Sequence, residues 1–231
     1  MSENIKKITK AFVVDLDSRE NQNILKPSAH PFNNQAHQVD EVVKKIYELI
    51  EDAKHSNDDI ILNHNKIKEA FFSPFKPQLK SAQVFLSHSH ADKNKALKVK
   101  NYLESKTNHR VFIDSLFWDY KDDVLNELEK YDNTSKIKDA FTLILRESLQ
   151  DMIEKCPYFV FLQSNNSVSN QGLSCITYSA WIYEELKIAH SISESRPIPM
   201  MESMQVFHDI SPFLESFETI TLKKLSQQIN S

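Results

Sequence analysis

The chain has 231 residues, of which 40% are hydrophobic, with a net charge of −4 and a pI near 6.1. This composition supports one buried core of ordinary size plus an appendage. The small negative net charge gives no sign of a basic surface that would bind nucleic acid or an anionic membrane. Two cysteines are too few for a disulfide framework, and with neither a secretory leader nor an apolar run of roughly 20 residues we expect a cytoplasmic protein.

The first 80 residues differ from the rest of the chain in their pattern of apolar and polar residues. A short apolar run at 11–16 is a candidate strand, and the polar, proline-containing stretch 18–38 reads as a loop. Apolar residues then recur at helical spacing over 39–53, and a second helix is expected over 60–72. Residues 1–80 are therefore expected to form a mainly helical N-terminal extension, whose role no residue in it decides.

From residue 81 onward, short apolar runs alternate with helical patterns. A charged insertion occupies 115–136, and its Val124, Leu125 and Leu128 suggest a helix of its own. The expected strands are 84–87, 110–114, 158–162, 198–200 and 217–222, and the expected helices are 92–105, 137–153 and 178–190. Such alternation predicts an α/β domain over 81–231, a parallel sheet with helices on both faces. Ser87 and Asp114 end two of its strands, at the edge where open α/β sheets bind ligands.

Three pieces of sequence lie in a particular order. They are V-F-L-S-H-S-H-A-D-K at 84–93, R-V-F-I-D at 110–114 and S-A-W-I-Y-E-E-L at 179–186. Together they resemble TIR (Toll/interleukin-1 receptor) domains, and the resemblance covers roughly residues 82–225. It implies a flavodoxin-like fold with five parallel strands in the order 2-1-3-4-5. The switch point would then lie between the first and third strands, flanked by Ser87 and the helix that carries Glu185.

The resemblance also implies an activity. Many TIR domains cleave NAD+ at the nicotinamide–ribose bond and depend on the glutamate of a W-x-x-x-E motif, which here is Glu185, four residues after Trp181. Residues i and i+4 share a helix face, so Glu184 would point elsewhere. The substrate-binding candidates are Ser87, His88, Asp114, Trp118 and Trp181.

Each of these candidates also has a simpler interpretation. Ser87 could cap a strand end, Asp114 could close a turn, and Trp118 could pack the insertion. His88 and His90 could be surface histidines, and Asp92 could cap the first helix of the domain.

One carboxylate is chemically sufficient for this reaction. Ordinary glycosidases need a second carboxyl group to protonate the leaving oxygen. Nicotinamide departs from NAD+ as a neutral molecule, so a single carboxylate can stabilise the developing positive charge on the ribose. Water would give ADP-ribose, and an internal nucleophile would give a cyclic product. NAD+ is then the substrate, and no cofactor or metal is expected.

The resemblance places such enzymes in bacterial anti-phage defence, with self-association through the TIR domain and an effector that responds to the product. The main alternative is a non-catalytic TIR adaptor that works by assembly. A zinc hydrolase is a weaker one: H-S-H-A-D-K at 88–93 is one residue from H-x-H-x-D-H, but Lys93 puts a cation in a ligand position. A third is a deoxyribosyltransferase-like enzyme with a glutamate nucleophile.

Overall fold

The structure is a computed structural model that describes residues 10–25, 39–54, 64–72, 81–113, 123–127, 129, 135–171, 174–193 and 208–230. The chain forms two compact units. The first consists of Met1–Pro31, Ser81–Ser115 and Gln150–Ser231, and the second of Phe32–Lys80 and Leu116–Leu149. In the described ranges, no helix combines the length and the apolar character that crossing a bilayer requires.

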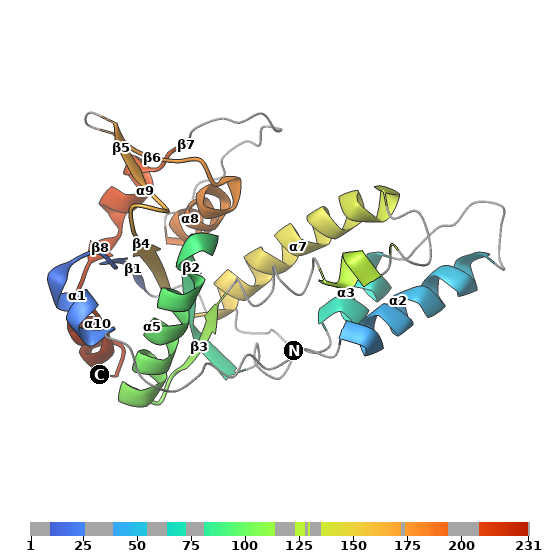
Figure 1. Ribbon diagram of the computed structural model, residues 1–231, viewed down its shortest axis with the longest axis horizontal. Helices are drawn as coiled ribbons and strands as arrows, with labels where there is room; N and C mark the ends of the chain where they lie inside the picture. The colour runs from blue at the N-terminus through green and yellow to red at the C-terminus, as the bar shows by residue number, and fades with distance from the viewer. Residues whose placement is uncertain are drawn as a thin grey trace. The chain divides into compact units, whose positions relative to one another are not determined.

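A parallel sheet of five strands forms the centre of the first unit (Figure 1). Its strands are β1 Lys10–Asp15, β2 Ala82–His88, β3 Arg110–Ile113, β4 Tyr158–Gln163 and β8 Glu218–Thr219. Each neighbouring pair is parallel, and the order is β3-β2-β4-β1-β8. The α/β class and the five-stranded parallel sheet agree with the prediction from the sequence.

The predicted strand order is wrong at one position. In the expected order 2-1-3-4-5, the fourth place belonged to residues 198–200, which lie outside the described residues. In the structure that place is taken by β1, which pairs with β4 along its whole length, from Lys10 opposite Tyr158 to Asp15 opposite Gln163. The apolar run 11–16 therefore belongs to the sheet, and a boundary at residue 80 does not separate the sheet from the extension.

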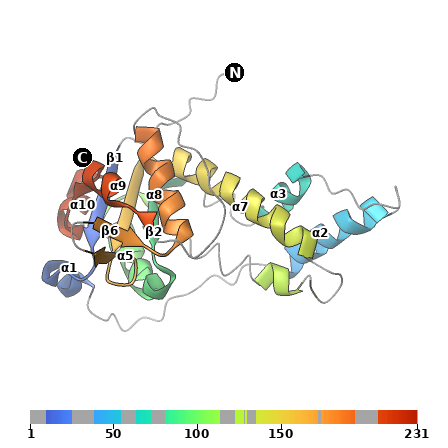
Figure 2. The same ribbon diagram turned by 90° about the horizontal axis from the view of Figure 1, so that it is seen from above.

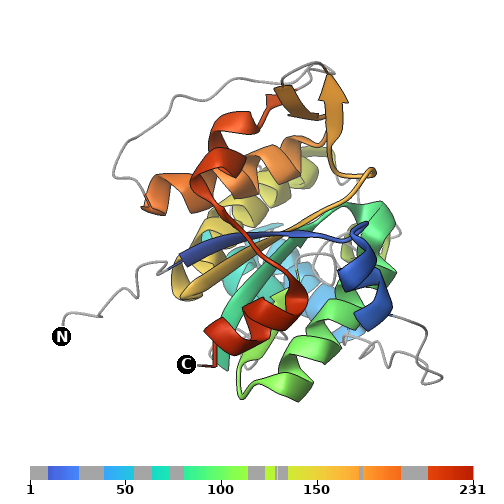
Figure 3. The ribbon, with the colours of Figure 1, turned by 90° about the vertical axis from the view of Figure 1, so that its left-hand side faces the viewer.

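Helices cover both faces of this sheet, as the sequence predicted (Figure 3). On one face, α5 contacts β2 and β3 as well as α10, and α10 contacts α1. On the other face, α8 contacts β1, β2 and α9. These helices are α1 Arg19–Ile24, α5 Lys93–Lys106, α8 Ala180–Ser193, α9 Ser211–Ser216 and α10 Leu222–Gln228, and a 3-10 turn, η1 His90–Asp92, precedes α5.

A small antiparallel sheet follows β4 and was not predicted. It consists of β5 Ser169–Gln171, β6 Ser174–Thr177 and β7 His208–Asp209, in that order. β6 contacts the start of α8 and also α9.

A cluster of phenylalanines lies on the α8 face of the large sheet. Phe85 of β2 stacks on Phe159 of β4 with ring centroids 5.8 Å apart, and it lies 5.9 Å from Phe112 of β3. Phe217, after α9, continues the cluster 5.8 Å from Phe159. Because side chains alternate along a strand, Ser87 shares this face with Phe85. The core thus continues up to the edge at which Ser87 lies.

The second unit is helical, and its helices α2 Val39–Lys54 and α3 His64–Phe72 contact each other (Figure 2). Residues 123–127 are helical, and so is the first part, 135–149, of α7 Ser135–Lys155. Lys68 of α3 pairs with Glu147 of α7 at 3.6 Å. The buried apolar side chains of these segments are Val42, Val43, Ile46, Ile67, Ala70, Phe71, Val124, Leu125, Ile144, Leu145 and Leu149. Helices therefore form where the apolar spacing predicted them, including one inside the insertion.

Candidate active site

Ser87 lies near the carboxyl end of β2, on the face of the sheet that α8 covers. It is the second-last residue of the strand and is fully buried. Its backbone is held in the sheet, since Ser87 lies opposite Phe161 of β4. The strand therefore fixes where its hydroxyl group points.

The helix opposite, α8, begins at a polar N-terminal turn. The hydroxyl of Ser179 accepts the backbone N–H of Ile182 at 3.3 Å, and the carbonyl of Ser179 accepts that of Tyr183 at 3.1 Å. The first bond caps an N–H that has no partner within the helix, and the second is the first backbone bond of the helix itself. The start of α8 is thereby set one turn before the residues that face the sheet.

Glu185 interrupts the apolar face of α8. Ile182, Leu186 and Ala189 are buried at helical spacing, and Glu185 lies in the same stripe with 0% of its surface exposed. Removing a carboxylate from water costs free energy unless it gains polar partners. Glu185 therefore stands out from the core packing of α8 as a candidate functional group.

Ser87 and Glu185 meet. The Ser87 hydroxyl donates a hydrogen bond of 2.5 Å to Oε2 of Glu185, between residues 98 positions apart in the chain. The contact joins the carboxyl end of β2 to α8, beside β4, which neighbours β2 in the sheet. The structure thus brings together two of the residues that the sequence nominated.

The adjacent glutamate is placed differently. Glu184 is only half-buried, and its carboxylate lies 4.0 Å from the ammonium of Lys187, one turn further along α8. Trp181 is half-buried and shares a helix face with Glu185, since the two are four residues apart. Of the two glutamates, Glu185 is the one that faces Ser87.

One other candidate, His88, lies away from this pair. His88 is buried but follows Ser87 directly in β2, so alternation places its side chain on the opposite face of the strand. Asp114 and Trp118 lie outside the described residues.

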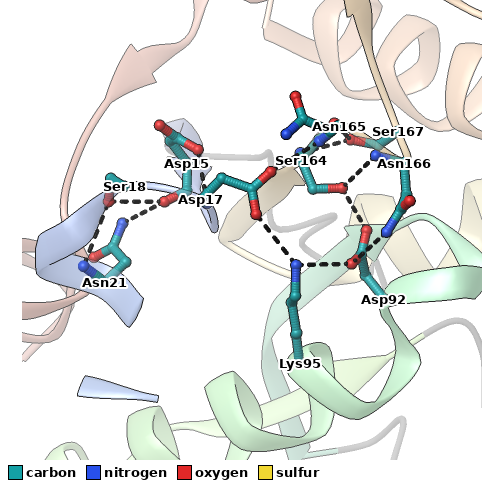
Figure 4. Close-up of polar contacts among 10 residues, drawn as sticks. All are labelled: Asp15, Asp17, Ser18, Asn21, Asp92, Lys95, Ser164, Asn165, Asn166 and Ser167. Carbon is teal, nitrogen blue, oxygen red and sulfur yellow. Dashed lines mark hydrogen bonds and ion pairs between the residues drawn. The ribbon is translucent and has the colours of Figure 1, made fainter. Parts of the chain in front are cut away.

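A second polar cluster lies at the same edge of the sheet, and Figure 4 shows its contacts. Asp92 is 1% exposed and accepts hydrogen bonds from the hydroxyl of Ser164 and from the side-chain amide of Asn166, the latter at 3.0 Å. Lys95 lies 3.2 Å from Asp92 and 3.2 Å from Asp17. Asp92 does stand at the N-cap position of α5, but its side chain makes no capping bond. The interpretation of Asp92 as a side-chain cap is therefore wrong.

Hydrogen bonds and ion pairs within this cluster shift the pKa values of Asp17 and Lys95. The backbone N–H of Asn165, which donates to Asp17 at 3.0 Å, and the nearby Lys95 hold the pKa of Asp17 below its ordinary 3.8. Burial alone would lower the pKa of Lys95, but its hydrogen bonds to Asp17 and Asp92 raise it above the ordinary 10.5. Asp17 and Lys95 are thus both charged over the whole neutral range.

Of its members, only Asp92 was singled out from the sequence. Asp17, Ser164 and Asn166 lie in polar segments that have no periodicity to mark them, and Lys95 lies on the predicted helix 92–105 without any motif to distinguish it. The one available signal was the position of these polar segments directly after strands.

The segment 88–93 does not form a zinc site. His88 is buried in β2, His90 is exposed, and Asp92 is engaged by Ser164, Asn166 and Lys95. In the part of the chain that the structure describes, no three His, Cys, Asp or Glu side chains gather closely enough to hold a metal ion.

Comparisons with protein-family models, with curated proteins and with solved structures find no match to this chain.

Proposed function

We propose that this chain is a TIR-type enzyme that cleaves the nicotinamide–ribose bond of NAD+, with Glu185 as its catalytic carboxylate. The observation that carries the proposal is the hydrogen bond from Ser87 to Glu185 at the carboxyl edge of a parallel sheet. Ligands of open α/β sheets bind at this edge, next to a switch point. The fold is then flavodoxin-like, with β1 in the place of the fourth strand.

The switch point supports this location. From β2 the chain continues to β3 on one side, and it later returns to β4 on the other side of β2. Ser87 stands on β2 at this division, and α8 carries Glu185 to it. The Trp181 and Glu185 pair then belongs to the crevice that the motif implies.

In the proposed reaction, the bond between C1′ of the ribose and the pyridinium nitrogen breaks. Its electron pair returns to the nitrogen, so nicotinamide leaves neutral and the ribose becomes oxocarbenium-like. Glu185 stabilises that positive charge as it develops, and no general acid is required. Water then adds to C1′ and loses a proton, which gives ADP-ribose. A ring nitrogen or hydroxyl of the same molecule gives a cyclic product instead.

Ser87 has a definite task in this scheme. By donating to Oε2, its hydroxyl group fixes the orientation of the Glu185 carboxylate relative to β2. Trp181, four residues before Glu185 on the same helix face, would line the crevice that the motif implies. Asp114 and Trp118 keep the binding roles that the resemblance implies, whereas His88 has no place beside Glu185.

Because Glu185 is fully buried, the arrangement corresponds to a closed site. NAD+ can reach the carboxylate only after a local opening, which we attribute to self-association through the α/β unit. In a cytoplasmic anti-phage system, the product would deplete NAD+ or act on an effector protein.

The same burial favours one other candidate, a TIR adaptor that assembles without turnover. In an adaptor, the Ser87–Glu185 bond would only join α8 to the sheet. Burying a carboxylate in an apolar stripe costs desolvation free energy that a purely structural contact between α8 and the sheet would not require, which favours the enzyme.

The test is incubation of the purified chain with NAD+ at several protein concentrations, followed by chromatography and mass spectrometry. The proposal expects nicotinamide and ADP-ribose or a cyclic isomer, with a rate per molecule that rises with protein concentration. Intact NAD+ at every concentration would favour the adaptor.

A further inference from the structure

The proposed reaction leaves one buried carboxylate at this edge of the sheet without a task. Oδ2 of Asp92 accepts from the hydroxyl of Ser164, and Oδ1 accepts from the side chain of Asn166 at 3.0 Å and pairs with Lys95 at 3.2 Å. Both oxygens are therefore occupied by groups of the protein. Asp92 is arranged to hold protein segments together rather than to take a ligand.

These contacts connect the loops that follow three neighbouring strands, and we call them the Asp92 clasp: Asp17, Asp92, Lys95, Ser164, Asn165 and Asn166 (Figure 4). Asp92 follows β2, and residues 164–166 follow β4. Asp17 follows β1, accepts the backbone N–H of Asn165 at 3.0 Å and bonds to Lys95 at 3.2 Å. Since β2, β4 and β1 are adjacent in the sheet, the clasp closes one continuous stretch of its carboxyl edge.

The position of Ser87 explains why such a clasp matters. The pairing of β2 with β4 ends at His88 opposite Leu162, one residue beyond Ser87. Strand and helix ends fray when nothing holds the chain beyond them. The next anchors are the Asp92 backbone N–H, which donates to the carbonyl of Ser89 at 2.8 Å, and the Asp92 side chain in the clasp.

We propose that Asp92 is a positioning residue of the site: it ties the end of β2 to the turn after β4 and so keeps the Ser87 hydroxyl beside Glu185. The role as a positioning residue rests on the proposed function. A displacement of about 1 Å in a catalytic constellation can cost on the order of a hundredfold in rate. Asp92 acts through Ser87 and does not itself touch the substrate.

The test compares Asp92→Ala, at the N-cap of α5, with a control change near the other end of that helix, Glu104→Ala. Glu104 is a partly buried carboxylate that, like Asp92, binds a lysine, Lys100 at 2.7 Å; it also accepts a backbone N–H, that of Val111 at 3.0 Å. It lies near the other end of α5, by the start of β3. Each variant removes an anchored carboxylate at one end of α5, but only Asp92 follows the end of β2.

For Asp92→Ala we expect kcat for NAD+ cleavage to fall roughly ten- to a hundredfold, with KM within about twofold, because the loss affects the positioning of Ser87 rather than binding. Asp92→Asn keeps an acceptor for Ser164 and should recover part of kcat. Glu104→Ala should lower the melting temperature but leave kcat unchanged. A kcat within about twofold of wild type for folded Asp92→Ala would overturn the proposal.

Hydrogen exchange gives a readout that needs no turnover. Asp92→Ala should raise exchange at least about threefold in residues 84–92 and in 180–190 of α8, since loss of the clasp loosens both sides of the Ser87–Glu185 contact. Glu104→Ala should not affect 180–190. If the wild-type chain does not cleave NAD+, the proposed function fails alone. Unchanged exchange in 180–190 of Asp92→Ala would then refute the coupling of the clasp to Glu185.

Discussion

The side-chain amide of Asn21 joins the beginning of the first unit to its end. Its oxygen accepts the backbone N–H of Leu222 at 2.9 Å, and its nitrogen donates to the carbonyl of Asp15 at 2.7 Å. Asn21 is 1% exposed, and Leu222 is 201 positions away, at the start of α10. One side chain thus satisfies a backbone N–H at a helix start and a carbonyl at the end of β1.

Replacing Asn21 with alanine should remove a partner of the Asp15 carbonyl and leave the buried backbone N–H of Leu222 without that acceptor. We expect the free energy of unfolding to fall by about 1–3 kcal/mol in urea denaturation. Asn23→Ala, an exposed position of the same helix α1, is the control and should change stability by less than about 0.5 kcal/mol. Equal effects of the two substitutions would show that the side-chain hydrogen bonds of Asn21 do not stabilise the fold.

The place of β1 in the sheet makes a second prediction. A fragment of residues 81–231 lacks β1, so β4 would lose its partner over the whole register Lys10–Asp15 and β8 would lose its neighbour. It should therefore fail to fold as a monomer, because Phe12, Val13 and Val14 are all buried core residues. Circular dichroism and size-exclusion chromatography measure this. A cooperatively unfolding monomer would contradict the strand order.

Local sequence patterns predicted most strands of the sheet but not the order of the strands. The apolar runs at 84–87, 110–114 and 158–162 correspond to β2, β3 and β4 within one or two residues, because each strand is buried on both faces. The run at 11–16 was visible as a strand. Its pairing with Tyr158–Gln163 was not, because the partners are about 150 positions apart and no residue type encodes which strand lies beside which.

The same distinction applies to the site. Ser87 and Glu185 could be chosen from a strand end and from helical spacing, and the structure brings them together. The clasp could not be chosen, since Asp17 and Ser164 lie in polar loops and Lys95 in the first turn of α5, and their proximity arises only from the sheet order. Polar networks between loops carry no sequence period.

The clasp predicts a dependence of stability on acid. The pKa of Asp17 is below 3.8 in the folded chain, so the contribution of Asp17 to stability is present above that value and is lost as the pH falls through the lower folded pKa. Asp17→Asn should therefore lower the melting temperature at pH about 6 and have little effect below pH about 3. Thermal melts of both proteins across this range measure it. A difference that grows toward acid would contradict the sign.

The dependence of stability on alkaline pH involves Lys95, the lysine that pairs with Asp17. The raised pKa of Lys95 means that its contribution is complete below 10.5 and is lost only above its folded value. In melts of Lys95→Met and wild type, the difference should thus be constant from neutral pH up to about pH 10.

Thiol chemistry should separate the two cysteines. Burial raises the pKa of Cys156 to about 12, whereas Cys175 is half-buried. Since the thiolate is the reactive form, iodoacetamide at neutral pH should label Cys175 first and Cys156 only when the chain unfolds. Peptide mass spectrometry with Cys175→Ser as control reads the result. Rapid labelling of Cys156 in the native chain would contradict the burial of its side chain.

The central claim is that one glutamate of an adjacent pair acts on NAD+. Glu185 contacts Ser87 with its carboxylate fully buried, and Glu184 is half-buried beside Lys187. The most direct measurement is therefore the rate of nicotinamide release by wild type, Glu185→Gln and Glu184→Gln at one protein concentration, with melting temperatures to confirm folding. We predict that Glu185→Gln lowers kcat by at least about a hundredfold and that Glu184→Gln stays within about threefold of wild type. Equal rates for wild type and a folded Glu185→Gln, or no release by any of the three, would contradict it.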